Sequence, residues 1–182
     1  MSKLFPVQEI GSLAKPLWRT KGLRQSLSAQ DLREAEEWAP KLGIDDYHDL
    51  AKGILKETDS RLRSKQVLEL STVYGLRLFE KAGLDNNGVG GEQQRVEMYE
   101  HVVQSVEGME FLGHVHSFDY KYFKKAVASS EIRRKHPIYL REFLDAKKHS
   151  RSPVKVPITG PYTLVDWSFN EYYLRKNQNP SP

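Results

Sequence analysis

Apolar residues recur at helical spacing between residues 28 and 82 of this 182-residue chain. Residues 28–31 (Ser-Ala-Gln-Asp) resemble a capping box, and apolar residues then follow at intervals of three and four until Pro40 and Gly43. Helical periodicity resumes over residues 46–82, a stretch too long for one ordinary helix, and Thr-Asp-Ser at 58–60 can cap a second one. The pattern therefore predicts three helices separated by short turns.

Three short apolar segments fit buried or edge strands, and each lies next to glycine residues. They are residues 4–10, 87–91 and 154–158. The predicted helices follow the first segment, and helical periodicity follows the second over residues 95–106 and the third over residues 162–173. Strands that alternate with helices favour parallel βα units, in which functional groups lie just after the carboxyl ends of the strands.

The segment between the second and third predicted strands completes the order of elements. Residues 111–127 alternate in places, which indicates a hairpin or an irregular insertion, and residues 138–148 fit another helix. We find no internal repeat and no linker before the polar, proline-containing tail at 176–182. The order of elements predicts an α/β fold over residues 1–175, followed by that tail.

Length and composition limit the classes of protein to which the chain can belong. Its 182 residues suffice for one buried core but fall short of the roughly 250 of a complete (β/α)8 barrel. The absence of cysteine excludes disulfides, thiolate zinc sites and cysteine nucleophiles within the chain. A mean hydropathy of −0.63 fits a globular domain. Because neither a membrane-spanning run nor a secretory signal is recognisable, we expect a cytoplasmic location and no membrane partner.

Charge is modest overall but clustered along the chain. The net charge of +4 favours anionic ligands without requiring nucleic acid. Basic clusters occur at 133–136 (Arg-Arg-Lys-His) and 147–151 (Lys-Lys-His-Ser-Arg), and residues 31–37 are acidic. Each basic cluster is either a solvated helix face or turn, or an anion site.

Candidate functional residues follow each predicted strand. They are Ile10-Gly11-Ser12, Gly91-Glu92 with Arg95, and Thr159-Gly160-Pro161 followed by Trp167. A glycine in each segment permits close backbone approach to a ligand, and the polar or aromatic group beside it can make specific contacts. Taken singly, each segment also has a purely structural interpretation. Ile10-Gly11-Ser12 fits a strand-ending turn, Glu92 fits a first-turn glutamate paired with Arg95, and Trp167 fits a core residue.

His114 and His116 form a further candidate pair, because alternating positions of a strand place two side chains on one face. Two imidazoles so placed can bind a metal ion, but no third ligand with a clear spacing is recognisable in the sequence. A surface pair or a hydrogen-bonded pair is the alternative interpretation.

Together, the three segments after the predicted strands resemble the catalytic barrel of the cobalamin-independent methionine synthase family. The matching stretches are EIGSL at 9–13, GGEQQRVEM at 90–98 and PITGPYTLVDWSF at 157–169. In that family an IGS turn ends the first barrel strand, a GE-x-x-R-x-[DE]-M segment follows the second, and an LTGP-x-T-x-x-x-WSF segment follows a later one. The resemblance extends from residue 9 to about 173. It implies a partial (β/α)8 TIM barrel, about the first half.

The resemblance also implies a substrate site for homocysteine. Ile10, Gly11 and Ser12 would contact the backbone of the amino acid, and Glu92 would bind its amino group. Such an arrangement is chemically suitable, because a zwitterion needs hydrogen-bond donors for its carboxylate and an acceptor for its ammonium group.

Two further residues correspond to positions near the methyl donor in the family. Trp167 matches the aromatic residue that borders the donor, and Arg133 belongs to a basic segment that resembles one near the folate, although the family's usual arginine falls opposite Ile132. The donor would be methyltetrahydrofolate or, as in short archaeal-type members, a methylcorrinoid protein. The chain begins almost at the IGS segment and so resembles the short type.

The implied reaction is methyl transfer to the homocysteine thiol, which forms methionine. Complete family members hold Zn²⁺ with a His, two Cys and a Glu on later strands, and the ion lowers the pKa of the thiol. Because none of those motifs occurs in the chain, we expect no metal site here and no activity from the chain alone. A half barrel exposes sheet edges and apolar surface, so we also expect a complementary C-terminal half, a second copy or a continuation of the chain to cover it.

Two other functions fit the same residues. A catalytically inactive paralogue would bind an amino acid or regulate without methyl transfer, and a nucleic-acid-binding module would use the two basic clusters. Three origins fit the length, namely a natural split product, a truncation and a proteolytic fragment.

Overall fold

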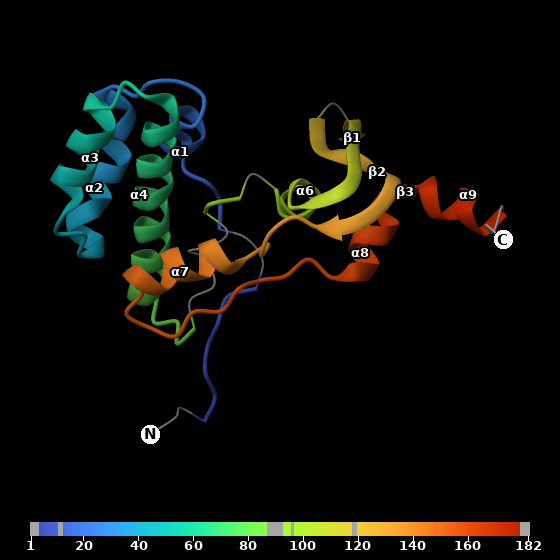
Figure 1. Cartoon of the computed structure of the whole chain (residues 1–182). Helices are drawn as coiled ribbons and strands as arrows, with labels where there is room; N and C mark the ends of the chain where they lie inside the picture. Colours follow the sequence, from blue (N-terminus) through green and yellow to red (C-terminus); the bar gives the residue numbers. More distant parts are fainter. Residues whose placement is uncertain (1–3, 11–12, 87–92, 96, 118–119, 179–182) are drawn as a thin grey trace. The chain divides into compact units, whose positions relative to one another are not determined.

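A computed structural model describes five stretches of the chain, which are residues 4–10, 13–86, 93–95, 97–117 and 120–178 (Figure 1). The backbone contacts divide the chain into two units. Unit 1 comprises Met1–Gln94 and Arg141–Pro157, and unit 2 comprises Arg95–Leu140 and Ile158–Pro182. In the described residues no helix is both long enough and apolar enough to cross a membrane.

Unit 1 is built from helices around one apolar core. Its elements are α1 (Leu17–Gly22), the 3-10 helix η1 (Ala29–Leu32), α2 (Arg33–Leu42), α3 (Tyr47–Lys56), α4 (Ser60–Lys81) and most of α7 (Leu140–His149). Helices α1, α2 and α3 all pack against α4, the longest of them (Figure 1). Trp18, Ile54, Val67 and Leu70 form the centre of the core, and each is at most 1% exposed. Their burial supplies the main stabilising free energy of this unit.

The start and stop signals of the predicted helices are largely confirmed. Ser28 and Asp31 form the expected capping box. Asp59 separates α3 from α4, since its carboxylate accepts hydrogen bonds from two backbone N–H groups of the first turn of α4 at 2.8 Å. Of the two expected stop signals, Gly43 is confirmed, since α2 ends at Leu42 and φ of Gly43 is +65°, whereas Pro40 lies within the helix. Burial of Leu42 offsets the free energy that is lost because the proline cannot donate a helical hydrogen bond.

The predicted strands of unit 1 are much reduced in the structure. Of residues 4–10, only Gln8 takes part in a bridge, which is parallel, to Asn86. Residues 154–158 form nothing longer than a single bridge at Val154, and Pro157 removes one of the N–H groups that a ladder would need. The predicted strand at 87–91 lies outside the described residues. The parallel direction of the first strand is thus observed, but the extended ladder is not.

Unit 2 is a three-stranded sheet with short helices. Its elements are α6 (Met98–Gln104), β1 (Val106–Ser117), β2 (Tyr120–Arg134), α8 (Pro161–Asp166), β3 (Ser168–Asn170) and α9 (Tyr172–Gln178). The strand order is β1-β2-β3, with β1 and β2 antiparallel and β2 and β3 parallel. Of the two alternatives for residues 111–127, the hairpin is confirmed, and it extends well beyond these residues. Tyr99 and Val103 of α6 pack on Phe123 and Ala126 of β2 to form the core.

The single helix expected over residues 162–173 is wrong. The chain leaves α8 at Trp167 and adds β3 to the sheet, with Ser168 opposite Ala126. Helical periodicity alone could not reveal this break, because it results from contacts that Trp167 and Ser168 make with other elements. The mixed α/β class is therefore confirmed, whereas the partial (β/α)8 barrel over residues 1–175 remains a prediction.

The capping carboxylate of Asp31 makes unit 1 sensitive to acid. Lys21 Nζ donates a hydrogen bond to Asp31 Oδ1, and the backbone N–H and the hydroxyl of Ser28 donate to Asp31 Oδ2 at 2.8 Å. These bonds, that of Lys21 above all, lower the pKa of Asp31 to about 2. The carboxylate therefore stays charged in the folded protein at pH values where it is protonated in the unfolded chain.

The Asp31→Asn variant should be less stable than the parent above about pH 4, and this difference should shrink as the pH falls from 4 towards 2, because the Asp31 carboxylate of the parent is then progressively protonated. Urea unfolding of both proteins between pH 2 and pH 7 measures the effect. Asp45→Asn, at an exposed turn residue, is the control and should follow the parent throughout. A difference that does not change with pH would contradict the prediction.

Candidate functional site

The structure describes three of the six residues predicted for the site. Gly11, Ser12 and Glu92 lie outside the described residues. Ile10 is described, and its side chain is 99% exposed. Trp167 and Arg133 are described within unit 2. What the structure shows of the predicted homocysteine site is therefore the set of residues that flank it.

Residues before the IGS and GE segments are joined by backbone and side-chain hydrogen bonds. The carbonyl oxygen of Val7 accepts from the N–H of Asp85 at 2.8 Å, and the N–H of Val7 donates to Asp85 Oδ2 at 2.6 Å. Next to this pair is the parallel bridge between Gln8 and Asn86. The chain therefore approaches the two segments side by side and in the same direction.

Residues after the two segments are joined as well, through Gln93. Its side chain is 1% exposed, and its Nε2 atom lies 3.5 Å from the carbonyl oxygen of Leu13, to which it donates. Gln93 Oε1 accepts from the hydroxyl of Ser71 on α4 at 2.8 Å. The backbone carbonyl of Gln93 accepts from Arg19 Nε at 2.7 Å, and burial lowers the pKa of Arg19 to about 10. Gln93 thus ties both segments to the helical core.

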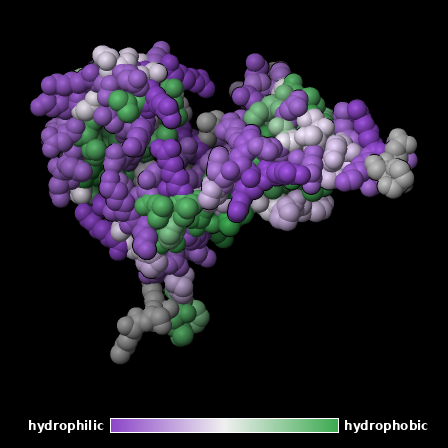
Figure 2. Space-filling view, in the orientation of Figure 1, coloured by the Kyte–Doolittle hydropathy of each residue, from purple (hydrophilic) through white to green (hydrophobic). Residues whose placement is uncertain are grey.

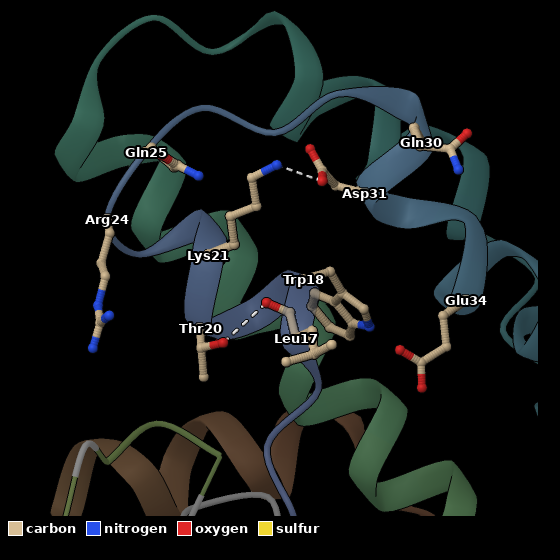
Figure 3. Close-up of a pocket in the computed structure, with 9 residues that line it drawn as sticks. All are labelled: Leu17, Trp18, Thr20, Lys21, Arg24, Gln25, Gln30, Asp31 and Glu34. Carbon is tan, nitrogen blue, oxygen red and sulfur yellow. Dashed lines mark hydrogen bonds and ion pairs between the residues drawn. The ribbon is translucent and has the colours of Figure 1, made fainter.

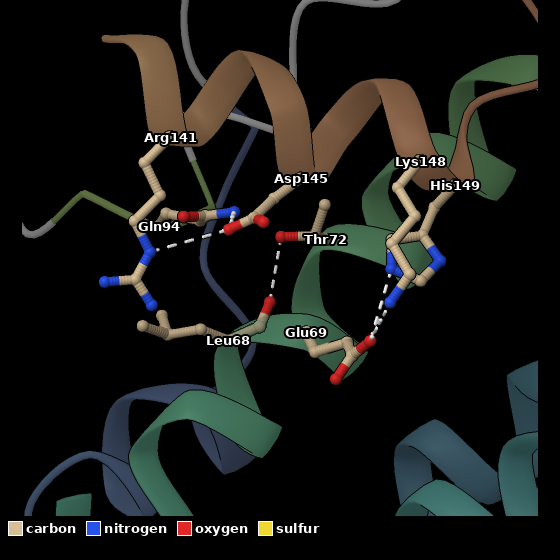
Figure 4. Close-up of polar contacts among 8 residues, drawn as sticks. All are labelled: Leu68, Glu69, Thr72, Gln94, Arg141, Asp145, Lys148 and His149. Atoms are coloured by element: carbon tan, nitrogen blue, oxygen red, sulfur yellow. Dashed lines mark hydrogen bonds and ion pairs between the residues drawn. The ribbon is translucent and has the colours of Figure 1, made fainter. Parts of the chain in front are cut away.

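Gln94 extends this anchoring to α7, as Figure 4 shows. Gln94 Nε2 donates to Asp145 Oδ2 at 3.1 Å, and Arg141 Nε lies 3.8 Å from the same oxygen. At the other end of α7, Lys148 Nζ and His149 Nε2 lie 3.2 Å and 3.3 Å from Glu69 Oε1. Part of the basic cluster at 147–151 therefore pairs with α4.

Within unit 1, Lys155 connects the chain just before the third motif to Glu9. Its ammonium group donates to the backbone carbonyl of Glu9 and lies 3.6 Å from Glu9 Oε1. Glu9 directly precedes the IGS segment, and Lys155 precedes Thr159-Gly160-Pro161 by four residues. The described residues that precede the first and third motifs are thus connected by polar contacts within unit 1.

In unit 2, Trp167 packs into an aromatic cluster. Its ring stacks on Phe123 with a centroid distance of 4.4 Å and an interplanar angle of 21°, and it lies 5.8 Å from Tyr99 and 6.3 Å from Tyr122. Trp167 is half-buried. The core interpretation of this residue is confirmed, and its partial exposure leaves it accessible for contact with a ligand.

Arg133 is exposed near the end of β2. Its guanidinium lies 2.8 Å from Glu131 Oε2, and this ion pair raises the pKa of Arg133 and lowers that of Glu131. On β1, a register irregularity separates His114 from His116, so the simple alternation expected for this pair is interrupted. Nothing in the contacts of Arg133 assigns it to a ligand.

Sequence reasoning missed three polar residues that organise the motifs, namely the buried Gln93 and Tyr99 and the half-buried Tyr139. Tyr139 accepts a hydrogen bond at its hydroxyl from the N–H of Thr159 at 3.2 Å, and the Arg95 guanidinium lies 4.7 Å from the centre of its ring. Of these three residues, only Gln93 lies inside a motif segment, GEQQR, that pointed to the site in the sequence.

A surface pocket in unit 1 contains none of the predicted site residues. It has a volume of about 640 Å³, and Figure 3 shows the side chains that line it. They are Leu17, Trp18, Thr20, Lys21, Arg24, Gln25, Gln30, Asp31 and Glu34. Lys21 and Asp31 pair with each other across it (Figure 3). The pocket is therefore formed by α1 and the capping turn at Asp31.

The metal-ligating side chains among the described residues do not form a zinc site. Among them, no group of three or more His, Asp or Glu side chains comes close enough together to hold a metal ion. The chain also lacks cysteine, which supplies the soft ligands that zinc prefers. We therefore derive no chemical step through a metal ion bound by this part of the chain.

The described elements define a mixed α/β chain with polar contacts next to its motif segments, and comparison with known proteins identifies its family. Residues 48–179 match the model of the cobalamin-independent synthase catalytic domain. The chain belongs to this family.

Several relatives are named methionine synthase. The protein from Pyrococcus horikoshii is 36% identical over 174 residues, which cover 95% of this chain and 43% of the relative. The protein from Thermoplasma volcanium is 44% identical over 114 residues, which cover 63% of this chain and 33% of the relative. The protein from Saccharolobus solfataricus is 31% identical over 183 residues, which cover 97% and 45%. The chain thus spans less than half the length of these relatives.

The Gln93→Leu variant should lose about 1–3 kcal/mol of unfolding free energy, because a side chain of similar size leaves the hydroxyl of Ser71 and the carbonyl of Leu13 without their partner. Urea unfolding measures the loss. Gln94→Leu is the matched control, and its loss should be smaller because water can replace the bond of this half-buried residue. Equal losses in the two variants would show that the amide of Gln93 has no special role.

Proposed function

We propose that this chain supplies the substrate side of a methionine synthase. In this proposal Ile10, Gly11 and Ser12 contact the backbone of homocysteine, and Glu92 binds its amino group. The observation that carries the proposal is the double connection of the two segments, by Val7 with Asp85 before them and by Leu13 with Gln93 after them. Because Ser12 and Glu92 each lie one residue from the second connection, their side chains can act on one ligand.

The charges of these residues suit an amino acid. Backbone N–H groups and the Ser12 hydroxyl can donate to the carboxylate, and the Glu92 carboxylate can accept from the ammonium group. Two charge-assisted contacts at opposite ends of the α-carbon fix the direction in which the side chain of homocysteine extends. The sulfur atom is then held in place for reaction with a donor.

The methyl donor lies next to Trp167 in this proposal, and Arg133 is a second donor-facing residue. A flat, half-buried indole already held by Phe123 suits contact with the ring system of methyltetrahydrofolate or the edge of a methylcorrinoid. In the transfer the sulfur gains the methyl group, the thiol loses its proton, and the donor atom retains the electron pair of the broken bond.

A separate part of the barrel completes the enzyme in this proposal and carries the zinc ligands. The relatives are more than twice as long as the matched region, so a large part of each has no counterpart in this chain. Unit 2 exposes apolar side chains that such a part can cover, among them Ile158, Tyr162 and Val165 on and before α8, each at least 70% exposed. Figure 2 shows apolar side chains at the surface of both units among mostly hydrophilic residues. A second copy of the chain is the other candidate to cover them.

The proposal is tested by calorimetry of homocysteine binding to the chain mixed with the unmatched part of the Pyrococcus horikoshii relative. The parent chain should bind homocysteine, and Glu92→Gln should weaken binding roughly tenfold or more, since the variant loses a charge-assisted hydrogen bond. Size-exclusion chromatography of the same mixture measures whether the two parts associate.

Glu171→Gln is the matched control, because Glu171 is an exposed residue of unit 2 that pairs with Arg175. It should bind like the parent. Unchanged binding by Glu92→Gln would remove Glu92 from the site. Binding without methyl transfer when zinc and both candidate donors are supplied would favour the inactive, regulatory paralogue, and salt-sensitive binding of RNA or DNA without any binding of homocysteine would favour the nucleic-acid module.

A further inference from the structure

We infer that Tyr99 is a positioning residue for Trp167, which it places by fixing the point where β3 joins the sheet. This inference rests on the proposed function, in which Trp167 borders the methyl donor. Tyr99 lies on α6, far from Trp167 in the sequence, and its side chain is 0% exposed. All the residues that carry the inference lie in the described part of unit 2.

The hydroxyl of Tyr99 contacts both members of one strand pair. The backbone N–H of Ala126 on β2 donates to it at 3.1 Å, and its oxygen lies 2.8 Å from the Ser168 hydroxyl on β3. Ala126 and Ser168 are the opposed residues that open the parallel pairing of β2 with β3. A single buried hydroxyl therefore bridges the two strands at the residue pair where β3 starts.

The direction of each hydrogen bond follows from the number of protons available. The Ser168 hydroxyl donates its one proton to the carbonyl oxygen of Leu164 on α8, at 2.6 Å. Ser168 Oγ must then accept the proton of Tyr99, whose own oxygen accepts from Ala126. The chain of bonds runs from β2 through α6 and β3 to α8, and every hydroxyl in it both donates and accepts.

This chain of bonds supplies directionality that the aromatic packing lacks. The stacking of Trp167 on Phe123 is compatible with small shifts of the indole across the ring, whereas a hydrogen bond tolerates little change in distance or angle. Ser168 follows Trp167 directly, so the bond to Ser168 limits where the indole lies. A slip of β3 by one residue would break the bond and turn its side chains to the other face.

Tyr99→Phe tests the inference, because it keeps the ring and removes the hydroxyl. Chains labelled with 5-fluorotryptophan give three fluorine resonances, for Trp18, Trp38 and Trp167, and Trp167→Phe assigns the third. Tyr99→Phe should shift or broaden the resonance of Trp167 and leave those of Trp18 and Trp38, which lie in unit 1, unchanged. The matched control is Tyr122→Phe, because Tyr122 also lies near Trp167 but its hydroxyl bonds to no described residue. It should leave the Trp167 resonance in place.

Ser168→Ala cuts the same chain of bonds at its next link and keeps the test decisive if Tyr99→Phe fails to fold. It should change the Trp167 resonance as Tyr99→Phe does, and Ser168→Thr, which keeps a hydroxyl, should restore it. If the substitutions only lowered the stability of the fold, the Trp167 resonance would not depend on whether residue 168 carries a hydroxyl. An unchanged Trp167 resonance in both Tyr99→Phe and Ser168→Ala would overturn the inference.

A second measurement separates this inference from the proposed function. Methyltetrahydrofolate is titrated into the chain mixed with the same relative's unmatched part, and Tyr99→Phe should bind roughly five- to tenfold more weakly, because binding must then order an indole that the parent already holds in place. Tyr122→Phe should bind like the parent. If the parent does not bind methyltetrahydrofolate, the proposed role of Trp167 towards this donor fails, while the fluorine resonances still decide whether Tyr99 positions the indole.

Discussion

The need to satisfy one buried amide constrains the region on which the proposed function depends. Gln93 is almost completely buried, so its amide must find partners within the protein or lose free energy on folding. It finds them at Ser71 and Leu13, which are 22 and 80 residues away in the sequence. Because an amide can satisfy both partners in very few arrangements, burial of Gln93 specifies how the motif segments meet the helices, which apolar packing alone would leave less defined.

The same physical principle organises unit 2, where tyrosine hydroxyls replace the amide. Tyr139 holds the backbone of Thr159, and Tyr99 holds Ser168, so the two ends of the third motif are each fixed by a buried or half-buried phenol. The ring of a tyrosine packs like an apolar residue while its hydroxyl reaches a defined partner. Each unit thus combines an apolar core with a few polar groups whose partners are distant in sequence.

Those partners explain how much of the fold could be predicted. Local signals sufficed for α3, α4 and the hairpin, because a capping aspartate and the alternation of residues act within one element. They failed for α1, which the burial of Trp18 stabilises, and for the break between α8 and β3. At Ser168 the sequence continues to favour a helix, but the bonds to Tyr99 and the pairing with β2 outweigh that local preference.

The candidate site shows the same division between local and distant information. Trp167 could be recognised from its motif, but the motif could not decide between a core residue and a ligand contact. The structure makes these alternatives compatible, because Trp167 is packed on Phe123 and yet only half-buried. An aromatic ring that binds a ligand loses less entropy when the core already holds it in one orientation. Packing against the core is therefore what would make Trp167 effective next to a methyl donor, and the residues that fix its position belong to the site as much as those that touch the ligand.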